Sequence, residues 1–582
     1  MLKTGRTLKT EAERTVLIMD NIPENKCVLA MYDVRGIQDY IFRTSKMKDA
    51  IGASAIVEDI LDNALEYTFR RMHNDKPDLT GDLNWCDDSH TYNYNDSNAK
   101  DIQVLYIGGG NAYVTYRTEG LCREFNQIMA KYVLDKTYSL QLAVAFVEKS
   151  GNYNVDYRKL QRAMQEVKAN MVHSMPIGAL PVMRADVKTG RPVIADECKI
   201  AGYTPEKRDS VESMETYLKR KAICDLRRNE KMDAEAKKLD SYVEKKGVDS
   251  TLAVVHIDGN NMGLRIRNLV QDIADYTEAV NKMRQISFSI NSSYKKVFEQ
   301  MKQCFDEGTE LERKKNDYFV MKVLVAGDDV TYICNGKIAL ATVEYFCKEI
   351  SKYTLMGTPQ ENGKRTEEEK EEFVRIYGFS VCAGIAYFNS HFPFSISYDV
   401  AEECCDLAKK RAKSEDCRDG DRIGNFVDFQ LCQNIHARNL KEMRHREYMT
   451  SHGEQLLIRP YFISTDKDFG LSKLTGQPFD FQNFKDAAEH FLNPQEHNGK
   501  QEYFPGSLIK DIRNTYPLGK NQMENLKVFL ESRDWKLPGN SGEFYVDDLG
   551  GKKTARWYDV TEMLDYYIAL EKIVPAEQKE GE

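Results

Sequence analysis

The feature of this sequence that most constrains its fold is an order of elements that occurs twice. Apolar runs, helical periodicity and glycine turns predict strand, helix, hairpin, helix and strand between residues 28 and 147, and the same order between residues 252 and 388. This order is typical of the ferredoxin-like βαββαβ unit. We therefore expect an α/β (α+β) protein with two such domains, a helical linker module and a mainly helical C-terminal domain.

The expected elements follow from the local pattern. In the first copy we expect strands at residues 28–33, 102–107, 112–116 and 140–147, and helices at residues 53–72 and 121–133. In the second copy we expect strands at residues 252–258, 318–326, 330–334 and 379–388, and helices at residues 264–305, 338–353 and 396–412. The first hairpin turn reads Gly108-Gly109-Gly110-Asn111, and glycine permits the positive φ angles of tight turns.

These patterns divide the chain into five segments. The residues between the copies are charged and helix-prone, and helical patterns recur near the C-terminus at residues 481–491, 521–532 and 560–573. The predicted segments are an N-terminal extension (1–26), a first domain with a degenerate hairpin (27–180), a linker module (181–249), a second, catalytic domain (250–427) and a helical C-terminal domain (428–582).

Composition narrows the class of protein. A net charge of -9 gives no global electrostatic reason to bind nucleic acid, although a local basic channel is compatible with it. The 13 cysteines have no regular spacing, and neither a signal segment nor an apolar run of about 18 residues occurs. We therefore expect a cytoplasmic protein that does not associate with membranes.

Three aspartates of the second copy fall at places that the fold brings together. The first and third strands of a βαββαβ unit are neighbours, so Asp258 at the end of the first strand lies beside the hairpin that carries Asp328 and Asp329. Carboxylates on rigid strands are suited to Mg²⁺ or Mn²⁺. Such ions promote in-line attack of a ribose hydroxyl on an α-phosphate, so the sequence predicts a metal-dependent nucleotidyltransferase.

The same copy offers groups that suit a triphosphate. The loop Gly259-Asn260-Asn261-Met262-Gly263 leads into a helix, where backbone N–H groups can bind phosphate oxygens. Lys409, Lys410 and Lys413 on the closing helix are candidates for phosphate contacts as point charges.

Each signal also has an ordinary structural explanation. A Gly-Asp-Asp turn is often only a hairpin, an aspartate that ends a strand is often a helix cap, and lysines on a helix usually face solvent. The joint placement of these residues in one predicted unit favours a functional site.

Several motifs resemble known families. The aspartate of the first strand, the turn Gly327-Asp328-Asp329 and the helix at residues 401–409 resemble GGDEF nucleotidyl cyclases. The two copies in one chain are more similar to the large polymerase-like subunit of type III CRISPR effector complexes, which has two palm domains. Residues 34–42, residues 46–54 and the hairpin at residues 108–111 resemble the first palm domain of that family and its non-catalytic hairpin.

The resemblance implies a function and a set of contacts. In that family the second palm domain joins ATP into cyclic oligoadenylates when the complex binds target RNA. Asp258, Asp328 and Asp329 would bind the metal, with the Gly259 carbonyl as a further ligand. The residues expected to contact nucleotide are Gly259, Asn260, Asn261, Met262, Gly263, Ser287, Gly327, Lys409, Lys413 and, in the first hairpin, Gly109, Gly110 and Asn111. The implied partners are ATP, guide and target RNA, and other subunits of the complex.

The sequence departs from the family pattern at several positions. Ala326 precedes Gly327 where two glycines are usual, and Asn260 stands where an aspartate is common. Cys198 and Cys224 are isolated, so we expect no zinc site between the palm domains. No His-Asp dipeptide occurs, and we expect no DNA cleavage by the nuclease domain that carries it in many relatives.

Two alternatives stay open. Ala326 and Asn260 would fit a non-catalytic scaffold that binds nucleotide or RNA. Against this, glycines and Asn111 replace the hairpin carboxylates in the first copy, whereas the second copy keeps all three of its carboxylates. The two palm domains would also fit a stand-alone cyclic dinucleotide synthase in anti-phage signalling.

Overall fold

The structure is a computed structural model. It describes residues 26–42, 47–85, 94, 100–108, 110–171, 179–186, 189–193, 212–228, 251–307, 318–356, 367–389, 392–432, 440–450, 452–465, 471–497, 499–539, 543–547, 551 and 553–574. Most of the predicted N-terminal extension, much of the linker module, Gly109, Cys198 and the side chain of Cys224 lie outside the described residues. The chain divides into two compact units, residues 1–237 with 261–291 and residues 238–260 with 292–582.

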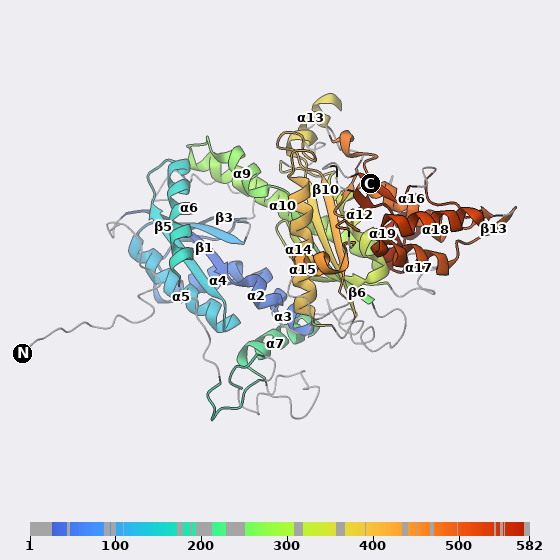
Figure 1. Ribbon diagram of the computed structural model, residues 1–582. Helices are drawn as coiled ribbons and strands as arrows, with labels where there is room; N and C mark the ends of the chain where they lie inside the picture. The colour runs from blue at the N-terminus through green and yellow to red at the C-terminus, as the bar shows by residue number, and fades with distance from the viewer. Residues whose placement is uncertain are drawn as a thin grey trace, which may run out of the picture. The chain divides into compact units, whose positions relative to one another are not determined.

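The first unit contains a five-stranded sheet with the order β2-β3-β4-β1-β5 (Figure 1). The strands are β1 (Val28–Arg35), β2 (Gly81–Asp82), β3 (Ile102–Gly108), β4 (Asn111–Tyr116) and β5 (Gln141–Glu148). β1 is antiparallel to both of its neighbours, β4 and β5, and a hairpin joins β3 to β4. This is the strand order of a βαββαβ unit, so the predicted fold of the first copy is confirmed.

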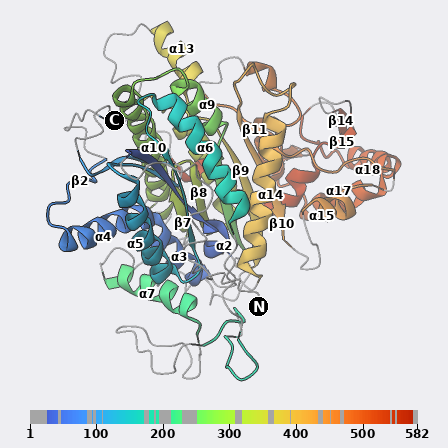
Figure 2. The same cartoon turned by 90° about the vertical axis from the view of Figure 1, so that its left-hand side faces the viewer.

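The helices of the first unit correct one prediction and include one helix that was not predicted. They are α2 (Ile37–Phe42), α3 (Met47–Glu58), α4 (Ile60–Asp75), α5 (Glu119–Thr137), α6 (Tyr153–Asn170), α7 (Met214–Arg228) and α9 (Met262–Val270). The single helix expected at residues 53–72 is wrong, because Asp59 leaves the helical conformation and separates α3 from α4. Helix α6 was not expected; the Asn152 side chain caps it, and it packs on β5 and β1 (Figure 2).

The first half of α10 (Tyr276–Glu307) belongs to the first unit. The Arg284 guanidinium donates hydrogen bonds to the backbone carbonyls of Leu105 and Val104, and the Tyr276 hydroxyl donates to Asp156 at 2.5 Å. The helical stretch expected at residues 264–305 consists of two helices, since α9 ends at Val270 and α10 begins at Tyr276.

The second unit contains a six-stranded sheet with the order β11-β10-β9-β6-β8-β7. The strands are β6 (Thr251–Gly259), β7 (Val320–Ala326), β8 (Asp329–Asn335), β9 (Val381–Asn389), β10 (Asn425–Leu431) and β11 (Tyr461–Ile463). β6 is antiparallel to its neighbours β8 and β9, as the second βαββαβ copy predicts. β10 was not expected; it is parallel to β9, and the domain boundary placed after residue 427 falls inside it.

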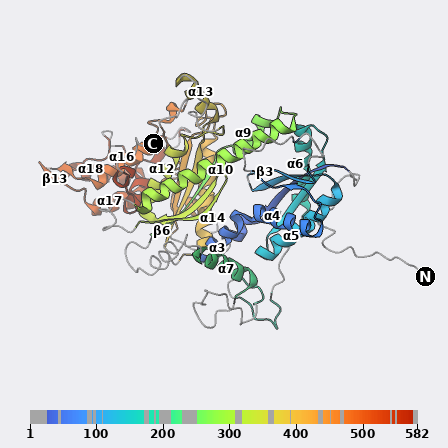
Figure 3. The same cartoon turned by 180° about the vertical axis from the view of Figure 1, so that it is seen from behind.

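Helices cover both faces of this sheet. Gly384 of β9 lets α14 (Phe394–Ala412) approach closely, since a Cβ atom there would lie 1.9 Å from the Ala401 carbonyl oxygen. Tyr332 packs from the opposite face against Phe298 of α10, and its hydroxyl donates to Thr342 of α12 (Ala339–Ile350). Figures 1 and 3 show α14 and α10 on opposite sides of the sheet.

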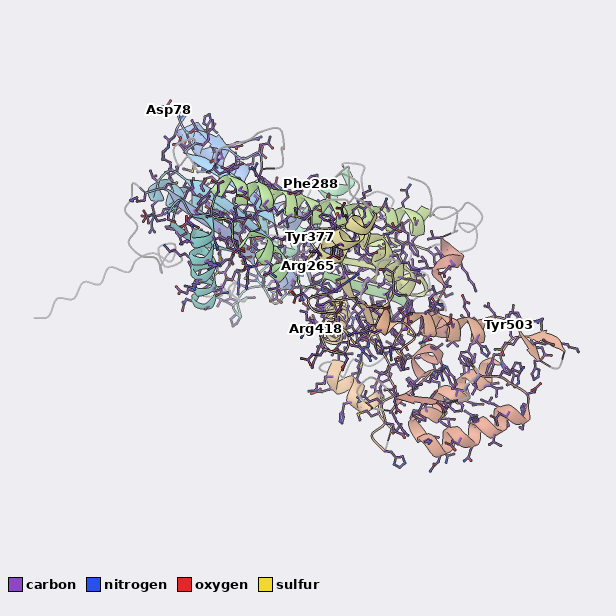
Figure 4. All side chains as sticks on the ribbon, turned by 90° about the horizontal axis from the view of Figure 1, so that it is seen from above. Asp78, Arg265, Phe288, Tyr377, Arg418 and Tyr503 are labelled. Atoms are coloured by element: carbon purple, nitrogen blue, oxygen red, sulfur yellow. The ribbon has the colours of Figure 1, made fainter. Side chains whose placement is uncertain are left out.

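The C-terminal part is mainly helical, as predicted. Its helices are α15 (Leu440–Glu447), α16 (Phe481–Leu492), α17 (Gly506–Thr515), α18 (Lys520–Ser532), α19 (Tyr558–Met563) and α20 (Leu570–Ile573). Buried Arg459 ties this part to the sheet, because its guanidinium lies 2.9 Å from Glu562 of α19 and 4.0 Å from Asp428 of β10. Tyr503 is exposed beside β13 (Lys500–Glu502), at the far end of the C-terminal part (Figure 4).

No helix among the described residues is both long and apolar enough to span a membrane.

Candidate nucleotidyl transfer site

Two of the predicted carboxylates are directly paired across neighbouring strands. Asp258 of β6 stands opposite Asp329 of β8 in the antiparallel register. Ala326 pairs with Asp329 and closes a two-residue turn made of Gly327 and Asp328. Gly327 has φ of 64°, which favours glycine, whereas Ala326 is in the strand and needs no glycine. The alanine at this position therefore leaves the hairpin geometry intact.

Lys409 reaches this pair from α14. Its ammonium donates a hydrogen bond to Oδ2 of Asp258, although the two residues belong to elements far apart in the chain. Burial is the largest single effect and lowers the pKa of Lys409, but the charge of Asp258, the hydrogen bond to it and smaller contributions from neighbouring groups together raise the net pKa. The lysine is therefore held in its charged form at the carboxylates.

Among the described residues, neither hairpin carboxylate is paired with a lysine or arginine as Asp258 is with Lys409. Burial, and next the charge of Asp258, raise the pKa of Asp328 to about 7 and the pKa of Asp329 to about 7. Within the described residues, Oδ1 of Asp329 is buried without a hydrogen-bond partner. The site therefore has an excess of negative charge that a bound cation would relieve.

His256 is a neighbour of the carboxylates that the sequence prediction did not include. Its Nδ1 lies 3.1 Å from the Thr331 hydroxyl and 3.4 Å from Oδ1 of Asp329, and its ring meets the Tyr398 ring edge-on. Burial lowers the pKa of His256. Strand alternation was a usable signal, because His256 and Asp258 are two residues apart and share one face of β6.

The predicted phosphate loop is divided between the two units. Asn260 belongs to the second unit, where its buried amide donates to the Gly424 carbonyl at 3.0 Å and to the Ser380 hydroxyl at 3.2 Å. Asn261, with φ of 54°, precedes α9, which contains Met262 and Gly263 in the first unit. The Asn260 amide thus joins loops of the second unit, a role that an aspartate could not fill.

The other predicted contacts have separate places. Ser287 is buried in the first unit, where its hydroxyl would lie 2.5 Å from a Cβ atom at Gly108 of the first hairpin. Gly110 and Asn111 are in that same hairpin, whereas Gly109 lies outside the described residues. Lys413 is exposed at the end of α14, as is Lys410 one turn earlier.

The oxygen donors of these residues fit a divalent cation, but they do not form a closed ligand cluster. The unpartnered oxygen of Asp329 and the register of Asp258 beside it supply the hard oxygen donors that Mg²⁺ and Mn²⁺ prefer. In the described part of the chain, however, no three His, Cys, Asp or Glu side chains are gathered closely enough to hold a metal as they stand. One of the three carboxylates, Asp258, is engaged by Lys409.

A ferredoxin-like sheet with carboxylates at the end of its first strand and on its hairpin defines a palm domain. Residues 251–435 match the family model described as Cas10/Cmr2, second palm domain. Over these residues the chain is Cas10-like, and the resemblance to the large subunit of type III CRISPR effector complexes is confirmed.

Solved structures that are similar to the chain include Csm1 proteins. The chain is similar to Csm1 in T. onnurineus (13% identity, TM-score 0.47, covering 95% of this chain and 71% of that one). It is also similar to a Csm1–Csm4 cassette in complex with AMPPNP (13%, 0.46, 94% and 70%) and to one in complex with cA4 (15%, 0.43, 93% and 70%). At these TM-scores the similarities carry no argument about individual residues. Curated protein sequences give no significant match.

Proposed function

We propose that this protein is a nucleotidyltransferase that condenses ATP into cyclic oligoadenylate-type second messengers. The observation that carries the proposal is the cross-strand pair of Asp258 and Asp329 beside Asp328, with Lys409 against them, inside the residues that match the second palm domain of Cas10/Cmr2. The carboxylates can bind a divalent cation, and the lysine can bind phosphate oxygens. Together they suit a nucleoside triphosphate, which is an anion that carries a bound cation.

Each group has a role in this proposal. Asp258, Asp328 and Asp329, with the Gly259 carbonyl, would hold Mg²⁺ or Mn²⁺, which when bound lowers the pKa of the attacking ribose hydroxyl and neutralises charge on the leaving pyrophosphate. Lys409 holds a phosphate oxygen as a point charge. His256, which is hydrogen-bonded to Thr331 and lies 3.4 Å from Oδ1 of Asp329, orients the Asp329 carboxylate.

The biological setting follows from the family. We propose that the protein works in a type III CRISPR-like antiviral complex with other protein subunits, guide RNA and target RNA, and that target RNA activates synthesis. Matching structures of the Csm1–Csm4 cassette have been solved with AMPPNP and with cA4, which makes ATP and its cyclic products the first compounds to test.

The test is product formation by the full-length protein. The protein is incubated with each nucleoside triphosphate and Mg²⁺ or Mn²⁺, with and without RNA-bound partner subunits, and products are identified by mass spectrometry. We expect cyclic oligoadenylates that disappear in Asp328→Ala/Asp329→Ala. The exposed acidic pair just beyond α14 provides a matched control, Glu415→Ala/Asp416→Ala, which should keep activity.

The outcomes separate the alternatives. Product without partners would indicate a stand-alone synthase, and a linear or mixed-base product would change the substrate class. Absence of product under every condition, with nucleotide still bound, would replace the proposal by the scaffold function.

A further inference from the structure

The two palm domains correspond in strand register as well as in topology. Asp33 of β1 stands opposite Asn111 of β4, as Asp258 of β6 stands opposite Asp329 of β8. Both hairpins also carry an irregularity at the same distance from the turn, between Val104 and Tyr106 in β3 and between Lys322 and Leu324 in β7. Asp33 is therefore the first-copy equivalent of Asp258.

The helix that follows the fourth strand is equivalent too. In each copy a lysine stands fifteen positions after the first residue of this helix, Lys168 in α6 and Lys409 in α14. Lys168 pairs with Asp33 at 2.8 Å, and Lys409 pairs with Asp258. The same lysine–aspartate contact is thus made independently in both units.

The surroundings of the two pairs differ in charge. The first copy has Asn111 where the second has Asp329, Met31 in place of His256, and Gln161 in place of Glu402. Gln161 donates to the Tyr113 hydroxyl at 2.9 Å, so this position has become part of an uncharged network. The lysine–aspartate contact consequently does not depend on the acidic hairpin or on the nucleotide that the hairpin would bind.

The charge balance of the two sites is therefore unequal. In the first palm domain one ammonium faces the single carboxylate of Asp33. In the second, the one ammonium of Lys409 pairs with Asp258, and the hairpin adds the carboxylates of Asp328 and Asp329. A dication that binds all three has to share or take Asp258 from Lys409, because the two cations compete for the same carboxylate.

We propose that Lys409 is an internal counterion that closes the resting site and is displaced from Asp258 when a divalent cation binds. This inference rests on the proposed function of the site. The released ammonium is then available for the triphosphate, so cation binding and phosphate capture are coupled through one side chain. In the first palm domain Lys168 makes the same contact permanently, because Asn111 removes the second carboxylate that a cation would need.

The experiment measures how fast each lysine amine is labelled in the full-length protein. Amine-reactive reagent is added with and without Mn²⁺, the labelling rates of Lys409 and Lys168 are read by peptide mass spectrometry, and bound Mn²⁺ is counted by electron paramagnetic resonance. We expect Mn²⁺ to raise Lys409 labelling about threefold to tenfold, because Asp258 then no longer holds the amine in an ion pair. Lys168 is the internal control and should not respond.

Two variants isolate the contact itself. Asp258→Asn should label Lys409 fast without Mn²⁺, and Mn²⁺ should add nothing further. Asp33→Asn should release Lys168 and leave Lys409 unchanged. A Lys409 rate in Asp258→Asn equal to that of the unaltered protein would show that the pair does not protect the amine, and would overturn the proposal.

A further measurement with an ATP analogue distinguishes a failure of this inference from a failure of the proposed function. An ATP analogue with a methylene group between the α- and β-phosphorus, added with Mn²⁺, should protect Lys409 again. If Mn²⁺ is bound but Lys409 labelling does not rise, the counterion proposal fails while the catalytic proposal stands. If no Mn²⁺ is bound with or without the analogue, both fail.

Discussion

At the scale of single residues, the carboxylates of the candidate site have a neighbour, His256, that the sequence prediction did not include. His256 is buried and contacts Thr331 and Asp329. It lies two residues before Asp258, a predicted metal ligand. Its equivalent in the first palm domain is Met31, which opposes Tyr113 in the same register. Because the first copy folds with methionine at this position, the fold does not require histidine there, and we expect His256 to act on the carboxylate of Asp329.

Replacement of His256 by its first-copy equivalent tests this role. His256→Met removes a hydrogen-bonding partner of Thr331, and we expect Mn²⁺ affinity to fall about tenfold, since partners behind metal ligands typically contribute that much. Mn²⁺ binding is measured by electron paramagnetic resonance. His256→Asn, which restores a polar group, should recover part of the loss; equal loss in both variants would assign His256 to packing alone.

Asn260 allows a second prediction at this scale. Asn260→Asp would place a carboxylate oxygen against the Gly424 carbonyl in a buried position, so we expect a loss of stability of about 1–3 kcal/mol in urea unfolding. An unchanged stability together with tighter Mn²⁺ binding would contradict this and make position 260 a missing metal ligand.

At the scale of elements, the contact between α14 and the sheet determines where Lys409 lies. This helix was expected at residues 396–412 and is found at Phe394–Ala412, but its face could not be predicted from sequence alone. The absence of a side chain at Gly384 of β9 sets how closely the helix approaches. A position of this kind depends on tertiary packing between segments distant in the chain, whereas local periodicity gives only the extent of the helix.

The strands and helices that were missed have similar physical reasons. β10 is a short, wholly buried run, which periodicity does not distinguish from a loop or buried helix, and its parallel pairing with β9 is not local. Helix α6 was more accessible to prediction, because Tyr153, Leu160 and Met164 recur at helical spacing after the cap Asn152. The hairpin and central strands were predictable because their apolar runs and glycines are local signals.

A substitution at Gly384 tests the approach of α14. In Gly384→Val the new side chain meets the Ala401 carbonyl and the Cys405 backbone nitrogen, so α14 has to move away from the sheet. We expect a loss of stability of about 2–4 kcal/mol and faster labelling of Lys409. Gly120→Ala in α5 is the control, since nothing lies within 4 Å of the added atom, and it should be neutral or slightly stabilising. Unfolding in urea and amine labelling provide the two readouts.

At the scale of the whole molecule, buried charged residues connect the sheet of the second palm domain to the C-terminal part. Arg459 is surrounded by Asp428, Asp559 and Glu562, and its guanidinium also lies over the Phe429 ring. These groups come from β10, α19 and the segment between them. The C-terminal part is therefore joined to the sheet of the second palm domain by a network that is not local in sequence and that composition did not predict.

Without this arginine, we expect the C-terminal part to unfold at a lower urea concentration than the sheet of the second palm domain. Arg459→Leu leaves Asp559 and Glu562 buried without their cation, and we expect a loss of about 3–5 kcal/mol, seen as an earlier transition in urea and faster proteolysis after residue 432. Arg446→Leu, which removes an exposed arginine of α15, should change stability by less than about 0.5 kcal/mol. Equal effects of the two substitutions would contradict a special role of the buried network.

The shared position of Lys168 and Lys409 has a consequence for the history of the chain. A contact made at the same helix position and the same strand register in both copies is most simply inherited from one ancestral palm that already carried it. The acidic hairpin is the trait in which the descendants diverged. The lysine–aspartate contact is therefore older than the difference between the two hairpins, and a palm domain can make it without an acidic hairpin.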